Sequence, residues 1–202
     1  MSVEWGGCGI TDEVLQDFAT TRLDQLLLDE LPKLLEKLNL SKGDVVECAI
    51  NLAENSLSAP EPLAELLQRL RRADVHITSL DLRNNFLVDV ATAVLVKHLQ
   101  ESAEAQRPLM HLYVSGNTFT DKGVRVLVEG AHRCEAYPRA SSAPRLLSLG
   151  AAEAARRTLW LSVENQRPPL QHPVGLLSLL EDKGFPAFVA PQDEQPPATA
   201  VV

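Results

Sequence analysis

The sequence predicts an α/β fold in which strand–helix units repeat and stack as a short solenoid. A short stretch with alternating apolar residues and a following asparagine, such as Leu80, Leu82 and Asn85, occurs several times. The spacing is nearly constant, with 30 residues from Asn55 to Asn85 and 32 from Asn85 to Asn117. Apolar residues at helical spacing follow each copy. One strand and one helix cannot bury their own apolar faces, so such units must stack on their neighbours.

Each unit places apolar residues at its first, fourth, sixth and eleventh positions and asparagine at its ninth. The central unit has Ile77, Leu80, Leu82, Asn85 and Leu87, and the next has Leu109, Leu112, Val114, Asn117 and Phe119. The unit before them has Glu47, Ile50, Leu52, Asn55 and Leu57, with the acid in the first slot. A fourth, divergent unit has Leu161, Val163 and Gln166, with Asn165 one residue early. Asparagine bonds backbone groups that a bend leaves unpaired, so we expect a ladder of amides at the strand ends.

These units resemble the leucine-rich repeat family in its ribonuclease-inhibitor-like form, over residues 45–189. The resemblance implies a leucine-rich repeat solenoid, a short right-handed arc with the parallel sheet on its concave side and the helices on its convex side. Proteins of this family are commonly binding scaffolds. The resemblance therefore also implies a protein that binds another protein on the concave sheet.

Residues 1–44 are predicted to form an N-terminal helical cap over the first open layer of the core. Residues 1–10 are rich in glycine and are expected to be irregular, and Thr11 is placed to cap the first helix. Pro32 should kink the following helix or start a new one. A coiled coil is the alternative, but the apolar run is short and interrupted. One face of the first helix is expected to carry Val14, Leu15 and Phe18.

Four repeat helices are expected, at about 60–73, 89–103, 121–132 and 173–182. Their core-facing residues would be Leu63, Leu66, Leu67 and Leu70, then Val90, Val94, Leu95 and Leu99, then Val124, Leu127 and Val128. The spacing breaks at 135–157, which we interpret as a disordered insertion in the repeat domain. A last strand at 187–189 would close the core, and residues 190–202 are expected to be a flexible tail.

Composition places limits on the class of protein. The chain has 202 residues and a formal net charge of -8, which disfavours nucleic acid as a partner. Three widely spaced cysteines fit a reducing compartment better than a disulfide framework, and no signal peptide or membrane span is evident. The sequence therefore predicts a soluble cytoplasmic protein, expected to be a monomer.

The candidate site is the outward-facing part of the predicted sheet. Its register sets Ser79, His111 and Trp160 in one column, and Asp81 beside Tyr113 in the next. Exposed aromatic residues beside charges are typical of an interaction hot spot. The alternative is that Trp160 is buried under the insertion and His111 is merely solvated. The candidate partner-binding residues are Asp81, Arg83, His111, Tyr113, Trp160 and Glu164.

No arrangement of residues predicts catalysis, a metal site or a cofactor. Cys8 lies in a glycine-rich stretch, but it would need a base such as His111, which only the fold could bring to it. His132 and Cys134 have no second pair at zinc-site spacing. We therefore expect a protein that is not an enzyme. Two alternatives stay open, namely a regulatory or targeting domain of an enzyme or larger multidomain protein, and an element that self-associates through an uncovered solenoid end.

Overall fold

The computed structural model describes residues 1–37, 46–134, 137 and 159–171. The strands are β1 (Ser2–Glu4), β2 (Val46–Asn51), β3 (Val75–Asp81), β4 (His111–Tyr113) and β5 (Trp160–Ser162). The helices are α1 (Asp12–Asp17), the π-helical η1 (Phe18–Arg22), α2 (Leu23–Lys37), α3 (Pro60–Arg72), α4 (Ala91–Glu104) and α5 (Asp121–Arg133). The predicted helix at 173–182, the last strand, the tail and nearly all of the insertion lie outside the described residues.

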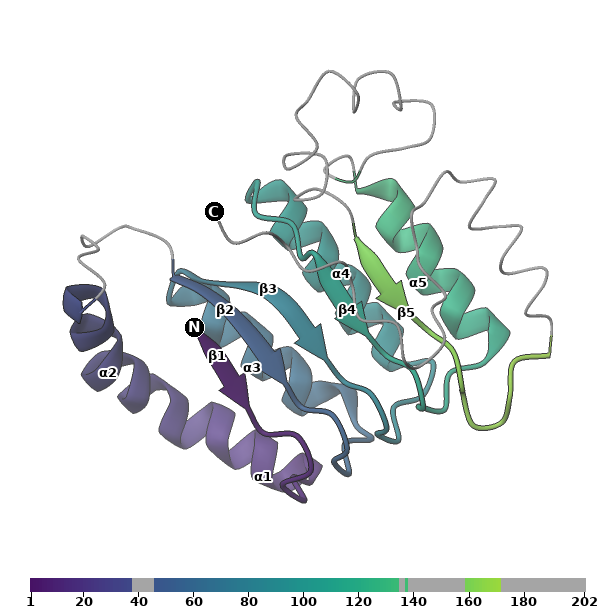
Figure 1. Cartoon of the computed structure of the whole chain (residues 1–202), viewed down its shortest axis with the longest axis horizontal. Coiled ribbons are helices and arrows are strands. Elements are labelled where there is room, and N and C mark those ends of the chain that lie inside the picture. The colour runs from purple at the N-terminus through teal and green to yellow at the C-terminus, as the bar shows by residue number, and fades with distance from the viewer. Residues whose placement is uncertain (38–45, 135–136, 138–158, 172–202) are drawn as a thin grey trace.

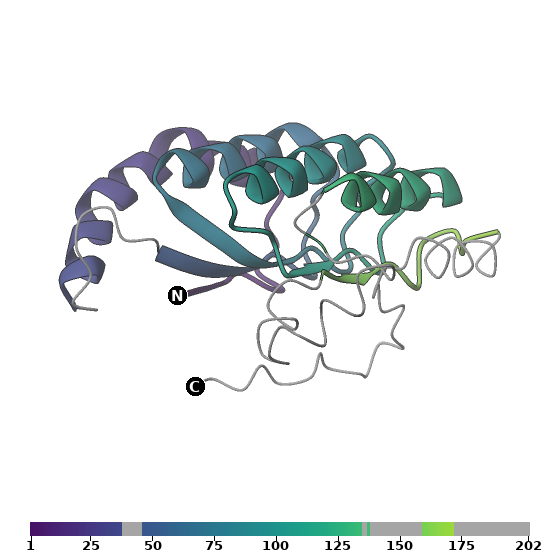
Figure 2. The ribbon, with the colours of Figure 1, turned by 90° about the horizontal axis from the view of Figure 1, so that it is seen from above.

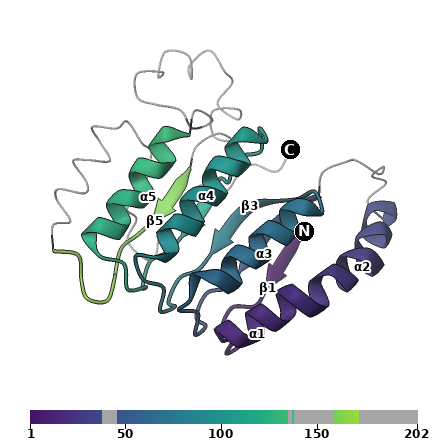
Figure 3. The same cartoon turned by 180° about the vertical axis from the view of Figure 1, so that it is seen from behind.

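All five strands form one parallel sheet in the order β1-β2-β3-β4-β5. The helices lie together on one face of this sheet (Figures 1 and 2). Figure 3 shows them from behind as a row that begins with α1 and α2 and ends with α5. The predicted α/β fold with a parallel sheet is therefore confirmed. The face opposite the helices, which we call the open face, is covered by none of the described helices.

The core lies between the sheet and the helix row. Leu52, Leu82 and Val114, the sixth residues of three units, are fully buried, and so are the inward leucines of α3. The predicted α3, α4 and α5 are confirmed to within two residues at each end. Helices α4 and α5 approach closely at Gly130, where a Cβ atom would lie 2.4 Å from Val96 Cγ2. Only glycine permits that approach without displacing a neighbour.

Amides at the strand ends form the predicted ladder. The Oδ1 of Asn85 accepts a hydrogen bond from the Leu57 amide, and the Oδ1 of Asn117 accepts one from Leu87, both at 3.0 Å. Gln166 extends the ladder, because its Oε1 accepts from Phe119 at 3.0 Å. The fourth unit therefore departs less from the pattern than its sequence indicates, since the longer side chain still reaches the same bonds.

The residue before each ladder position takes a left-handed backbone conformation. These residues are Glu54, Asn84, Gly116 and Asn165, all at positive φ. Such a conformation turns the chain sharply after each strand, and Gly and Asn adopt it at the lowest cost. A Cβ at Gly116 would also displace the Asn84 side chain, because it would lie 2.1 Å from Asn84 Oδ1.

Two predictions at the start of the sheet are wrong. Residues 1–10 are not all irregular, because β1 pairs with β2 in register with Ala49, Ile50 and Asn51. The first slot of the next unit holds Cys48 rather than Glu47. A bulge between Cys48 and Ala49 shifts the register, so Cys48 pairs with Ile77 and is fully buried while Glu47 is exposed. With an unbroken register the carboxylate of Glu47 would be buried, and the bulge avoids that cost.

Two expectations about the helices also fail. Val90 is the N-cap residue of α4 rather than a core position, and it is exposed. Val14 is exposed, because Leu15 of α1 and Ala19 of η1 face inward instead. Of the two outcomes expected at Pro32, a new helix is excluded, because α2 continues through this residue. The irregular stretch lies earlier, at η1, where a π-helical turn changes which side chains face the sheet. Thr11 caps α1 as predicted, accepting from the Val14 amide.

Candidate functional site

The open face carries the residues predicted to bind a partner, in the columns that the register set. Ser79, His111 and Trp160 are paired across β3, β4 and β5, and Asp81 is paired with Tyr113. Neighbouring parallel strands lie about 4.8 Å apart. The polar and aromatic side chains therefore form one continuous surface rather than separate groups.

Arg83 is held in place by Asp81. Its Nε donates to both carboxylate oxygens at 3.0 Å, and its Nη2 donates to Oδ2 at 2.6 Å. The carboxylate is mostly buried and also accepts from the Arg83 backbone amide at 3.0 Å. The hydrogen bond to Asp81 raises the pKa of Arg83, which stays charged. The guanidinium lies 5.3 Å from the centre of the Tyr113 ring, a cation–π distance.

Tyr113 and His111 form an uncharged aromatic pair next to this ion pair. Their rings are 6.2 Å apart and inclined by 15°, and the Tyr113 hydroxyl lies 3.4 Å from His111 Nδ1. Burial lowers the pKa of His111, so the imidazole is neutral at pH 7. Burial, aided by Asp81, raises the pKa of Tyr113. Both rings are partly exposed, so they present apolar area and hydrogen-bonding groups together.

Trp160 adjoins His111 at the far edge of this surface. Its backbone amide donates to the Met110 carbonyl at 2.7 Å, which fixes β5 against β4. The residue is partly exposed, and the insertion that would cover it in the alternative interpretation lies outside the described residues.

Glu164 forms the acidic end of the face. The Ser162 hydroxyl donates to its carboxylate at 2.9 Å and lies 3.2 Å from Ser115 Oγ. The carboxylate is close enough to Arg83 to raise the pKa of that guanidinium further. The Arg83 guanidinium therefore lies between the carboxylates of Asp81 and Glu164 on this surface.

Sequence reasoning missed the contribution of β1 to this face. Glu4 accepts a hydrogen bond from Asn51 Nδ2 at 2.9 Å, which adds a third acid to the surface. A signal was present, because Val3, Trp5 and Ile10 align with Ile50, Leu52 and Leu57. Cys8 takes the place of the ladder asparagine, and that replacement hid the repeat.

The fold does not bring the candidate nucleophile to a base. Cys8 follows β1, whereas His111 is on β4, three strand spacings or about 14 Å across the sheet. In the described part of the chain, no three of the His, Cys, Asp and Glu side chains gather as ligands of one metal ion. None of the described helices is long and apolar enough to cross a membrane.

Comparison with protein families places one repeat in a known class. Residues 105–128 match the family model described as a leucine-rich repeat. This range contains β4, the ladder residue Asn117 and the first part of α5. Comparison with curated proteins finds no match. The chain therefore contains a leucine-rich repeat, as the resemblance of its units implied, and such repeats generally mediate contacts between proteins.

Proposed function

We propose that the chain is a non-enzymatic protein-interaction module that binds a partner protein on its open face. In this proposal the units form a short ribonuclease-inhibitor-like solenoid, and the open face is its concave side. The observation that carries the proposal is the connected group of Arg83, Tyr113 and His111, flanked by Trp160, on a face that no described helix covers.

The physical support is the fixed arrangement of these side chains before any partner binds. Arginine, tyrosine and tryptophan are the residues that most often dominate binding energy at protein interfaces. Arg83 is fixed by three bonds to a nearly buried carboxylate, so it loses little conformational freedom on binding. His111 and Tyr113 are on β4 and Trp160 is on β5, and strands hold their side chains more rigidly than loops do.

The proposal includes a division of the chain. Residues 1–44 would be the N-terminal cap, 45–189 the repeat domain with its insertion, and 190–202 a tail. The cap is supported by Leu15, Ala19 and Leu23, which are buried at the first end of the helix row. An intracellular location is supported by the cysteines, because Cys8, Cys48 and Cys134 are all free.

Replacing Tyr113 and Trp160 together by alanine is expected to weaken partner binding by at least about tenfold. The change removes both large aromatic surfaces of the open face and leaves the buried strand residues intact. Capture from native lysate, followed by quantitative titration of the captured protein, measures the effect.

The matched control replaces Arg125 and Val126 on the exposed side of α5 by alanine, which should leave binding within about twofold. Thermal unfolding confirms that both variants fold. Equal binding by wild type and the Tyr113/Trp160 variant, with loss in the α5 variant, would move the site to the helical side.

A further inference from the structure

The sheet ends at β1, and no described residue pairs with the side of that strand that faces away from β2. The Trp5 amide donates to the Asn51 carbonyl at 2.9 Å, so the backbone groups of this residue point toward β2. Backbone groups alternate in direction along a strand, so the amides and carbonyls of Ser2 and Glu4 point the other way. An edge of this kind can hydrogen-bond one additional strand.

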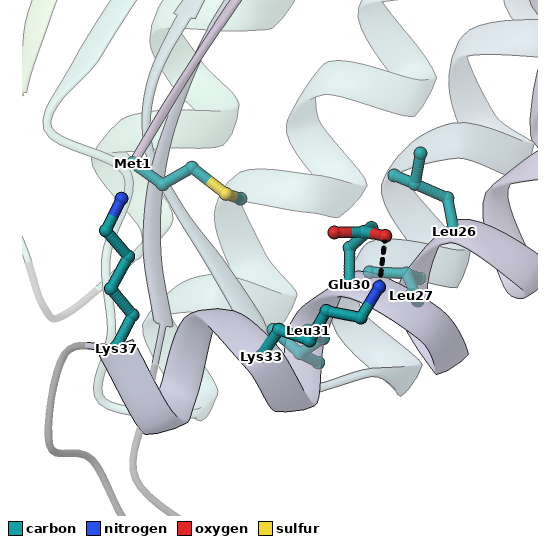
Figure 4. Close-up of a pocket in the computed structure, with 7 residues that line it drawn as sticks. All are labelled: Met1, Leu26, Leu27, Glu30, Leu31, Lys33 and Lys37. Atoms are coloured by element: carbon teal, nitrogen blue, oxygen red, sulfur yellow. Dashed lines mark hydrogen bonds and ion pairs between the residues drawn. The ribbon is translucent and has the colours of Figure 1, made fainter.

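Helix α2 stands across a groove from this edge (Figures 1 and 3). The groove has a volume of about 330 Å³ and lies between α2 and the first residue of the chain. Figure 4 shows Met1 on one side of it and the leucines of α2 on the other. The lining residues are Met1, Leu26, Leu27, Glu30, Leu31, Lys33 and Lys37. A groove of this size suits the side chains of a peptide segment rather than a folded domain.

The apolar side of α2 is incompletely covered along the groove. Leu23, at the start of the helix, is 3% exposed, whereas Leu26 is 50% exposed. Leu27 and Leu31 are only partly buried against the core. Figure 2 shows the cause, because the end of α2 descends from the helix row to the level of the sheet. Apolar side chains placed beside β1 would therefore contact the helix and the strand edge together.

The charges of the groove differ in sign from those of the whole chain. The formal net charge of the chain is -8, yet the groove is lined by two lysines and one glutamate. Lys33 Nζ donates to Glu30 Oε1 at 2.8 Å, which neutralises that pair. Lys37 forms no ion pair with a described residue. It is therefore available to an acidic group that enters the groove.

We propose that this groove binds an extended segment of a partner protein, in which apolar residues alternate and at least one residue is acidic. The segment pairs with β1 as an additional strand, which is a common way for a sheet edge to bind a peptide. Successive side chains of a strand point to opposite sides, so alternate apolar residues face Leu26, Leu27 and Leu31 of α2. The acidic residue meets Lys37. This site is separate from the open face, so it and the proposed function can fail independently.

Selection from a phage-displayed library of random peptides of about ten residues, the length of a long strand, tests the proposal. The target is the full chain carrying Tyr113→Ala and Trp160→Ala, which removes the aromatic residues of the open face as a competing site. We expect enriched peptides in which apolar residues alternate and Asp or Glu is present. Titration of a synthetic copy by fluorescence anisotropy should give a dissociation constant of about 10 to 100 μM. A selection that enriches no such peptide would overturn the proposal.

Two substitutions on the same helix locate the binding site of the selected peptide. Leu26→Glu puts a charge into the groove and should weaken binding at least about tenfold. The control Leu28→Glu changes a residue that is 71% exposed and does not line the groove. It lies about 200° around the helix from Leu26, so binding should stay within about twofold. Equal effects of the two variants would place the peptide elsewhere and overturn the proposal. Circular dichroism confirms that both variants keep their helix content.

Methylation of the peptide backbone tests the pairing with β1. In a paired strand, alternate amides point toward the neighbouring strand and the others point away from it. Two copies of the selected peptide are therefore made, each with one of the two alternate sets of amides methylated. One copy should lose at least about tenfold in affinity, because its donors to β1 are gone, and the other should lose much less. Equal losses in both copies would contradict strand addition at this edge.

Discussion

Replacing Asn117 by alanine is expected to lower the free energy of unfolding by about 3 kcal/mol. This side chain is fully buried, and its Oδ1 accepts from the Leu87 amide. Its Nδ2 donates to the carbonyls of Leu82 and Val114 at 2.8 and 3.0 Å. Alanine leaves the Leu87 amide and the carbonyls of Leu82 and Val114 without this partner, at a buried place where water does not replace it. Each such loss costs about 1 to 3 kcal/mol, and relaxation reduces the sum. Urea unfolding measures the change.

The matched control is Asn51→Ala. Asn51 is an asparagine on the open face, bonded to the exposed Glu4 and to the Ala53 amide. Water can replace the bond to Glu4, so this variant should lose no more than about 1 kcal/mol. Equal losses in the two variants would contradict the role of the amide ladder in holding the units together.

The second large effect is expected on acidification, which should destabilise the fold through His98. This residue of α4 is 7% exposed, and its Nε2 has no hydrogen-bond partner among the described residues. Burial, with the positive charges of His76 and Arg71, lowers its pKa from 6.5 to about 4. As the pH falls, His98 therefore takes up its proton in the unfolded chain before it does so in the folded chain. The stability that neutral His98 contributes is complete above pH 6.5 and is lost progressively toward pH 4, by about 3 kcal/mol.

Comparison with His98→Leu isolates this contribution. The variant removes both the titrating group and the unpaired nitrogen, so its stability should fall less between pH 7 and pH 4. The difference between the two proteins should change by about 3 kcal/mol over that range. Urea unfolding at a series of pH values measures it. Parallel pH profiles for wild type and variant would contradict the assignment to His98.

Apolar periodicity predicted most of the fold. Leucines and valines at helical spacing placed α3, α4 and α5, because each helix buries one apolar face against the sheet. The spacing of Asn55, Asn85 and Asn117 placed the ladder, because one amide bonds two neighbouring units and must recur with them. These features depend on local patterns, which a sequence displays directly.

The remaining features depend on long-range contacts that a local pattern does not display. β1 is short and is followed by a glycine-rich bend, and its pairing with β2 involves residues 47 apart in the chain. The bulge at Cys48 allows the thiol to be buried while Glu47 stays exposed. For the candidate site, the register set the columns, but the contact of Arg83 with Tyr113 also depends on side-chain rotamers.

Site-specific photo-crosslinking tests the proposed interaction surface most directly. A photoreactive phenylalanine analogue replaces His111 on the open face, and in a second protein it replaces Val126 on α5. Both chains are expressed in the native cell and irradiated, and their crosslinked products are identified by mass spectrometry. We expect one reproducible partner protein from the His111 position and none from the Val126 position. The same partner from Val126 alone would contradict the proposal and would place binding on the helices.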